Sequence, residues 1–149
     1  MREHRENIMK GKLIVALLGS FAASVAMADV SSVLTVDIQG PGGHSNGAYG
    51  NTNAVHAGAR AIMEIEKAIP SQKQCVVSGF SGGVSVNAIA ADGHFKVSLN
   101  AKDEKEMAQL KQKVEAAVKK GVDAENAFRS VKPGQLTGGV PAEVRYTIK

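Results

Sequence analysis

The residues most able to do chemistry in this chain lie in one glycine-rich stretch. Residues 40–58 read GPGGHSNGAYGNTNAVHAG, between a segment with strand periodicity and one with helix periodicity. His44 and Ser45 stand together on this loop, where the glycines let the backbone turn sharply and approach another group closely. Because the loop ends where a helix is expected to begin, free backbone N–H groups there could also hold an anion. The simpler interpretation is a flexible surface turn with an incidental histidine.

The sequence gives weaker signals for nucleotide binding and for a role of the other two histidines of the predicted domain. The stretch lacks the Lys-Ser/Thr of a phosphate-binding loop and the spacing of a dinucleotide-binding fingerprint, so we do not expect nucleotide binding. His56 has Arg60 one turn later, which is the spacing of an exposed helix face. His94 begins a predicted strand. Neither histidine forms a recognisable ligand pair with His44, so we expect no metal site.

Cys75 is the only cysteine, so the chain has no internal disulfide. It begins the apolar stretch CVV and has no basic residue beside it to lower the pKa of the thiol. We therefore expect a buried, inert thiol. A redox or nucleophilic role and an intermolecular disulfide remain alternatives.

The elements that must position these residues can be predicted from periodicity. Apolar residues alternate with polar ones over residues 33–39, 94–100 and 143–148, and an apolar run covers residues 74–80; each segment is expected to be a strand. A helix is expected over residues 53–68, capped by Asn51 or Thr52 and ended by Pro70. A second helix is expected from Asp103, with Glu106 reaching back to the cap.

This second helix is expected to stop at Gly121, followed by a polar connection over residues 122–141. The order is then β-α-β-β-α-β. With right-handed crossovers it gives an α+β, ferredoxin-like two-layer sandwich, in which a four-stranded antiparallel sheet carries two helices on one face. The open face would carry polar residues, namely Asp37, Lys96, Ser98 and Arg145. It lacks the aromatic residues of an RNA-binding sheet, so we expect no nucleic-acid partner.

The first 28 residues have the pattern of a secretory signal peptide. Basic residues precede the apolar run LIVALLGSFAASVA, and Ala26-Met27-Ala28 fits a cleavage site before Asp29. We expect residues 1–28 to be cleaved and residues 29–149 to form a single domain, located in the periplasm or secreted. The run is too short for a membrane anchor. Cleavage removes four of the 18 basic and two of the 14 acidic residues, and the remaining net charge of +2 does not indicate a nucleic-acid partner.

Two stretches of the chain resemble the dimerisation (lid) domain of a family of two-zinc hydrolases. The family includes aminoacylase, glutamate carboxypeptidase and succinyl-diaminopimelate desuccinylase. In its lid domain a strand ends in Gly, a His and a small residue follow, and Asn-Ala opens the helix. Here these positions are Gly40, His44-Ser45 and Asn53-Ala54.

The second half of the resemblance is the family's Gly-Gly followed by Asn and two apolar residues. Here these are Gly82-Gly83 and Asn87-Ala88-Ile89. The similarity covers roughly residues 33–118. The chain departs from the family at Ala90, where Pro is usual, and at Ser98-Leu99-Asn100, where the family has Asp-x-Arg.

The resemblance implies roles for four residues. In full-length relatives the histidine that matches His44 reaches across a dimer into the partner's active site, where it helps to stabilise the negative oxygen of the tetrahedral intermediate. Asn87, Gly82 and Gly83 would belong to the same substrate-binding region. The family's zinc-holding catalytic domain has no counterpart between the signal peptide and the last strand. We therefore expect this chain to bind no cofactor, and zinc to enter only through a partner.

Three functions are consistent with these observations. The first is an exported, non-catalytic domain that forms a homodimer through a sheet edge or the first helix. The second is an accessory subunit that donates His44 in trans to a separate zinc peptidase or amidohydrolase. The third is a small protein that binds peptides or acylated amino acids near His44 and Asn87. Free hydrolase activity is the least favoured, and any such activity is expected only with a partner.

Overall fold

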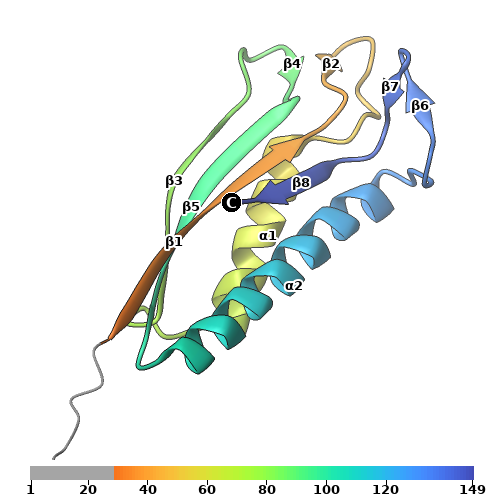
Figure 1. Cartoon of the computed structure of the whole chain (residues 1–149). Helices are drawn as coiled ribbons and strands as arrows, with labels where there is room; N and C mark the ends of the chain where they lie inside the picture. The colour runs from red at the N-terminus through yellow and green to blue at the C-terminus, as the bar shows by residue number, and fades with distance from the viewer. Residues whose placement is uncertain (1–28) are drawn as a thin grey trace, which may run out of the picture.

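The chain folds into a sheet covered on one face by two helices. The computed structural model describes residues 29–149, and Figure 1 shows both helices side by side on the same face of the sheet. The expected signal peptide lies outside the described residues. The main sheet has the order β3-β5-β1-β8 and consists of β1 (Val30–Gln39), β3 (Cys75–Gly82), β5 (Asp92–Ala101) and β8 (Arg145–Ile148). Its paired strands are antiparallel, so the predicted α+β, ferredoxin-like fold is confirmed.

The helices are α1 (Ala54–Ala68) and α2 (Glu104–Phe128). Helix α1 contacts β3, helix α2 contacts β8, and the two helices pack against each other. The alternation in the sequence correctly separates the two faces of the sheet. Val36, Phe95, Val97 and Leu99 are each at most 1% exposed beneath the helices. Val33 on the opposite face is 59% exposed.

The caps of the helices differ in part from the prediction. Asn53 caps α1, because its side-chain oxygen accepts from the backbone N–H groups of Val55 and His56. Thr52 instead donates to the carbonyl of Ala142, and Asn51 donates to the carbonyl of Gly42. The Asn51 bond closes the glycine loop on itself, and the Thr52 bond ties the loop to the segment that precedes β8.

The N-terminus of α2 follows the predicted pattern. The backbone N–H of Glu106 donates to the side chain of Asp103, and the Glu106 carboxylate accepts from the backbone N–H of Lys102.

The prediction that Gly121 ends α2 is wrong. The helix continues for seven residues to Phe128, and Gly121 lies buried inside it. A Cβ atom at this position would lie 2.3 Å from the backbone nitrogen of Ala61. The glycine is therefore explained by the close approach of α1 and α2 rather than by a helix stop.

Three regions expected to be loops contain short strands. β2 (Gly43–His44) pairs with β4 (Ala88–Ile89), and β6 (Leu136–Thr137) pairs with β7 (Val140–Pro141). All four gather at one end of the molecule, beyond the end of the main sheet (Figure 1). No helix within residues 29–149 has the length and apolar character needed to cross a membrane.

Candidate functional site

His44 and Asn87 are brought together by the small β2–β4 sheet. His44 pairs with Ala88, and the backbone N–H of Ser45 donates to the carbonyl of Asn87 over 2.9 Å. Gly43 has a φ of 135°, and a Cβ atom there would lie 2.8 Å from the Cβ of Ala48. A side chain at position 43 would therefore disturb the turn that presents His44.

The imidazole of His44 is held on both ring nitrogens. The backbone N–H of Asn46 donates to Nδ1 over 3.2 Å, and the side-chain amide of Asn87 lies 3.4 Å from Nε2. The other end of this amide is 2.8 Å from the hydroxyl of Ser85. Since Nδ1 accepts, a neutral imidazole carries its proton on Nε2.

The amide of Asn87 has two orientations of nearly the same shape, and only one suits this tautomer. The structure places Asn87 Nδ2 toward His44 and has Ser85 Oγ donating to Asn87 Oδ1. Turning the amide so that Oδ1 faces His44 lets the Nε2–H donate to Asn87 and the Asn87 amide nitrogen donate to Ser85. The opposite orientation places two donors face to face. The local network therefore favours His44 as an Nε2–H donor, which is the form that could share its proton with an anionic oxygen.

Gly82 and Gly83 lie at the start of the loop that carries Asn87. Gly82 pairs with Gly93, and a Cβ atom at Gly82 would lie 2.5 Å from the carbonyl oxygen of Asp92. Gly83 has a φ of 76°, which favours glycine. Backbone packing thus accounts for both glycines, and their role in binding a substrate remains a prediction.

The end of the molecule around His44 carries no full charges. Residues 40–52, 83–91 and 133–142 contain no Asp, Glu, Lys or Arg, although these make up 21% of the chain. Several large apolar side chains are exposed there: Tyr49, Val84, Val86, Leu136 and Val140. We call these three segments the uncharged end. A contiguous group of exposed apolar side chains is typical of an interaction surface.

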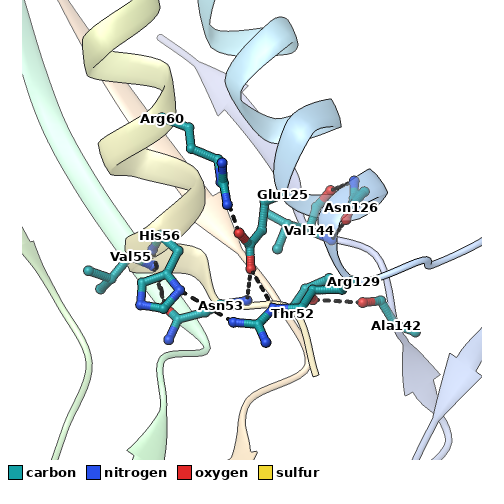
Figure 2. Close-up of polar contacts among 10 residues, drawn as sticks. All are labelled: Thr52, Asn53, Val55, His56, Arg60, Glu125, Asn126, Arg129, Ala142 and Val144. Carbon is teal, nitrogen blue, oxygen red and sulfur yellow. Dashed lines mark hydrogen bonds and ion pairs between the residues drawn. The ribbon is translucent and has the colours of Figure 1, made fainter. Parts of the chain in front are cut away.

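A second polar cluster, drawn in Figure 2, was not predicted. The carboxylate of Glu125 is fully buried and accepts from Arg60 Nε over 3.1 Å and from Arg129 Nε over 3.2 Å. It also accepts from the backbone N–H of Asn53 over 3.1 Å. Both guanidinium carbons lie 5.0 Å from the ring centre of Phe128. These contacts join the last turn of α2 to the first turns of α1.

A signal for this cluster is present in the sequence. The buried stripe of α2 continues beyond Gly121 at the same helical spacing, through Val122 to Glu125. Because the helix was expected to end at Gly121, Glu125 fell within the expected connection over residues 122–141. A glycine inside a continuing apolar stripe is better interpreted as a helix contact.

His56 and His94, the other histidines of residues 29–149, have partners of their own. His56 Nδ1 is 3.5 Å from Arg129 Nη2, and His94 Nε2 is 2.6 Å from Ser81 Oγ. Over residues 29–149, no group of three or more His, Cys, Asp and Glu side chains is placed to hold a metal ion. Cys75 is 8% exposed, and burial raises the pKa of its thiol, as expected of an unreactive cysteine.

The fold and the His44 loop define a small α+β domain with two helices on one face of a four-stranded antiparallel sheet. Residues 31–125 match the model of the peptidase dimerisation domain. The chain therefore belongs to the peptidase dimerisation domain family. Comparison with curated proteins finds no match.

Solved structures share this fold at low sequence identity. A hydantoinase/carbamoylase family amidase from Burkholderia ambifaria is 21% identical, with a TM-score of 0.55, over 84% of this chain and 28% of that one. The aminopeptidase PepT from Bacillus cereus is 12% identical, with a TM-score of 0.57, over 81% and 29%. An aminobenzoyl-glutamate utilization protein from Klebsiella pneumoniae is 18% identical, with a TM-score of 0.53, over 80% and 27%. The chain thus spans less than a third of the length of these proteins.

Proposed function

We propose that this chain is an exported, stand-alone peptidase dimerisation-type domain that forms a homodimer and has no zinc-dependent hydrolase activity of its own. The observation that carries the proposal is the outer edge of β3, together with the adjacent side of α1. Membership of a family of dimerisation domains supports it. The expected export rests on the sequence of residues 1–28 alone.

The β3 edge is suited to pairing with another strand. Its eight residues, CVVSGFSG, contain no charged side chain. The carbonyl of Gln74 accepts from the backbone N–H of Asn100, so these two residues form a hydrogen-bonded pair of the ladder. Hydrogen-bonded and non-hydrogen-bonded pairs alternate along antiparallel strands. The N–H and C=O groups of Val77, three residues after Gln74, therefore point away from β5. An uncharged strand edge of this length favours association with another strand unless it is covered.

The opposite edge of the sheet is less suited to this role. Strand β8 has only four residues, begins with Arg145 and is followed by Lys149. Short strands and flanking cations are devices that discourage edge-to-edge pairing. The comparison of the two edges therefore favours β3.

The side of α1 next to β3 adds an apolar surface. A Cβ atom at Gly82 of β3 would touch Val55, so this residue marks the side of α1 that faces β3. Ala59 and Ile62 follow Val55 on the same side at helical spacing. Two copies related by a two-fold axis would pair their β3 strands and bring these stripes together, which gives a closed, self-complementary interface.

The test is the mass of the purified protein in solution, measured by sedimentation velocity. We expect a dimer for the natural sequence and a monomer for Ala59→Arg, because a large charged side chain would stand in the centre of the interface. Ala124→Arg, at an exposed alanine of α2, is the matched control and should remain dimeric. A monomeric natural protein at high micromolar concentration would refute the proposed homodimer.

Export is tested separately by determining the N-terminus of the protein recovered from its cell. We expect a chain that begins at Asp29 in the periplasmic or secreted fraction. A cytoplasmic protein that retains residues 1–28 would contradict this part of the proposal.

A second function, an accessory subunit for a zinc peptidase or amidohydrolase, is favoured by one observation. His44, whose Nδ1 accepts from the backbone N–H of Asn46, lies on the uncharged end, which also exposes large apolar side chains. We infer that such a partner would cover this end and accept a hydrogen bond from the His44 Nε2–H at an anionic oxygen. Zinc would belong to the partner.

Affinity recovery of tagged protein from its own cells, followed by mass spectrometry, tests this second function. Recovery of a zinc hydrolase would support it, and His44→Ala should then slow that enzyme without abolishing association. Recovery of this chain alone, at dimer mass, would support the homodimer only.

A further inference from the structure

A β-bulge in strand β3 sets the position of Ser81. The pairing between β3 and β5 runs regularly to Ser78, which lies opposite Lys96, and resumes at Ser81, which lies opposite His94. Two residues of β3 therefore face only Phe95 of β5. Gly79 begins this bulge with a φ of 63°, a conformation that favours glycine.

The bulge separates two side chains onto opposite faces of the sheet. Phe80 turns toward the helices, where its ring stacks on Phe95 at 6.1 Å and lies against Gly58 of α1. Ser81 turns to the open face, where His94 also lies, since the adjacent Phe95 is buried. Regular pairing would have placed Phe80, not Ser81, opposite His94.

Ser81 and His94 are in direct contact. The serine Oγ lies 2.6 Å from Nε2 of the imidazole, and both residues are exposed. Asp37 is the register partner of His94 on the other side, in β1. Three adjacent strands thus place a serine, a histidine and an aspartate in one row across the open face, with cross-strand Cβ atoms about 5 Å apart.

The charges around this row suit proton transfer from the serine to the histidine. A carboxylate at Asp37, in register with His94 on the side away from Ser81, would favour the tautomer with its proton on Nδ1, and this would leave Nε2 free to accept the Ser81 proton. Lys149 lies 3.7 Å from Asp37 and helps to hold the carboxylate at the sheet. Lys96, two residues along β5 on the same face, provides a positive charge near the row.

We propose that Ser81 is a nucleophile toward small activated carboxylic esters, with His94 as its base and Asp37 as the residue that positions His94. The geometry is independent of the proposed homodimer, since pairing two β3 edges leaves the open face of the sheet uncovered.

The reaction uses only the ester and water. The Ser81 Oγ forms a bond to the ester carbonyl carbon while its proton moves to His94 Nε2. The bond from this carbon to the leaving oxygen then breaks, and the leaving group takes the proton from His94. In the second half, water gives a proton to His94 and attacks the acyl-serine, and Ser81 recovers its proton as the carboxylic acid leaves.

The experiment measures acetylation of the purified protein by p-nitrophenyl acetate, with the modified residue located by peptide mass spectrometry. We expect Ser81 to be acetylated at least about tenfold faster than Ser78, and we expect His94→Gln to remove this difference. This rate ratio lies below the usual contribution of a positioned general base, because the Ser81–His94 pair is exposed to solvent. Ser78→Ala is the matched control, because Ser78 stands on the same face of the same strand, and it should leave the rate at Ser81 unchanged.

Asp37 is tested by rescue. Asp37→Asn should slow acetylation of Ser81, and Asp37→Glu should restore part of the rate, which a purely structural role would not produce. Equal acetylation of Ser81 and Ser78, an unchanged rate in His94→Gln, or no acetylation of Ser81 would overturn the proposal. Melting curves of each variant show whether a lost rate reflects lost folding.

Discussion

At the scale of single residues, Glu125 shows how one buried carboxylate can join three segments of the chain. Its oxygens accept from Arg60 in α1, from Arg129 just after α2, and from the backbone N–H of Asn53 that precedes α1. Burial of a charge is unfavourable unless it is fully paired, and here every partner is in place. The cluster also anchors the start of α1, directly after the loop that carries His44.

Glu125→Ala should therefore destabilise the fold strongly, because it leaves two guanidinium groups beside a buried cavity. We expect the free energy of unfolding to fall by about 3 kcal/mol. Urea denaturation measures the change. Asp123→Ala is the matched control, since Asp123 forms an exposed pair with Lys119 at the same i, i+4 spacing and should cost less than about 1 kcal/mol. Equal losses for the two variants would contradict this account of Glu125.

At the scale of elements, the contact between α1 and α2 depends on small side chains. A Cβ atom at Gly121 would lie 2.3 Å from the nitrogen and 2.4 Å from the Cα of Ala61, so even a methyl group requires the helices to separate. Replacing a helical glycine by alanine normally stabilises a helix by about 1 kcal/mol. Here the close approach should reverse the sign.

Gly121→Ala is expected to lower the free energy of unfolding by about 2 kcal/mol, within the range for an overfilled core. The melting temperature and urea midpoint should both fall. Gly47→Ala is the control, because a Cβ atom there meets nothing within 4 Å, and it should be nearly neutral. A more stable Gly121→Ala variant would show that the helices can separate without loss.

The same pair of helices is linked by an ionic contact that depends on pH. Lys120 of α2 and Lys67 of α1 hydrogen-bond to the carboxylate of Glu64, and they lower its pKa below the ordinary value of 4.5. A carboxyl group with a lowered folded-state pKa adds stability above its unfolded-state pKa. This stability is lost as the pH falls through the folded-state pKa.

Glu64→Gln should therefore lower the melting temperature at pH 7, and the difference from the natural protein should disappear in acid as the carboxyl group of Glu64 is protonated. The effect should also shrink in high salt, since the lysines are exposed. Melting curves at several pH values measure it. Glu66→Gln, at an exposed position of the same helix, is the control and should change the melting temperature less at pH 7.

At the scale of the whole molecule, the two ends and two edges of the sheet have different characters. One end carries the two short sheets, β2–β4 and β6–β7, and its three segments contain no full charges (Figure 1). One edge of the main sheet is the uncharged strand β3, which lies beside an apolar stripe of α1. The uncharged end favours docking of a partner, and the uncharged β3 edge favours pairing of two copies.

A homodimer predicts that the melting temperature rises with protein concentration, because association stabilises only the folded state. Scanning calorimetry at several concentrations measures this dependence. Ala59→Arg should remove it and Ala124→Arg should not. A melting temperature independent of concentration in the natural protein would contradict association in the measured range.

The order of the main elements and their buried faces follow from the amino-acid sequence alone. Alternation at residues 33–39 and 94–100 identified strands, since one face of each must be apolar in a two-layer fold. Family motifs also indicated His44 and Asn87, 43 residues apart, and the structure places their side chains within 3.4 Å of each other. Whether either residue binds a ligand remains a prediction.

Features that depend on contacts between distant segments of the chain become visible in the folded structure and not in the sequence. Gly121 carries the local signal of a helix stop, but it lies inside α2, where the absence of a side chain lets the backbone of Ala61 approach. The pairing of Ser81 with His94 depends on a bulge whose register is visible only when β3 lies beside β5. Local patterns record the conformation and the buried face of each segment, whereas close approach, strand register and buried charge pairs are set by packing.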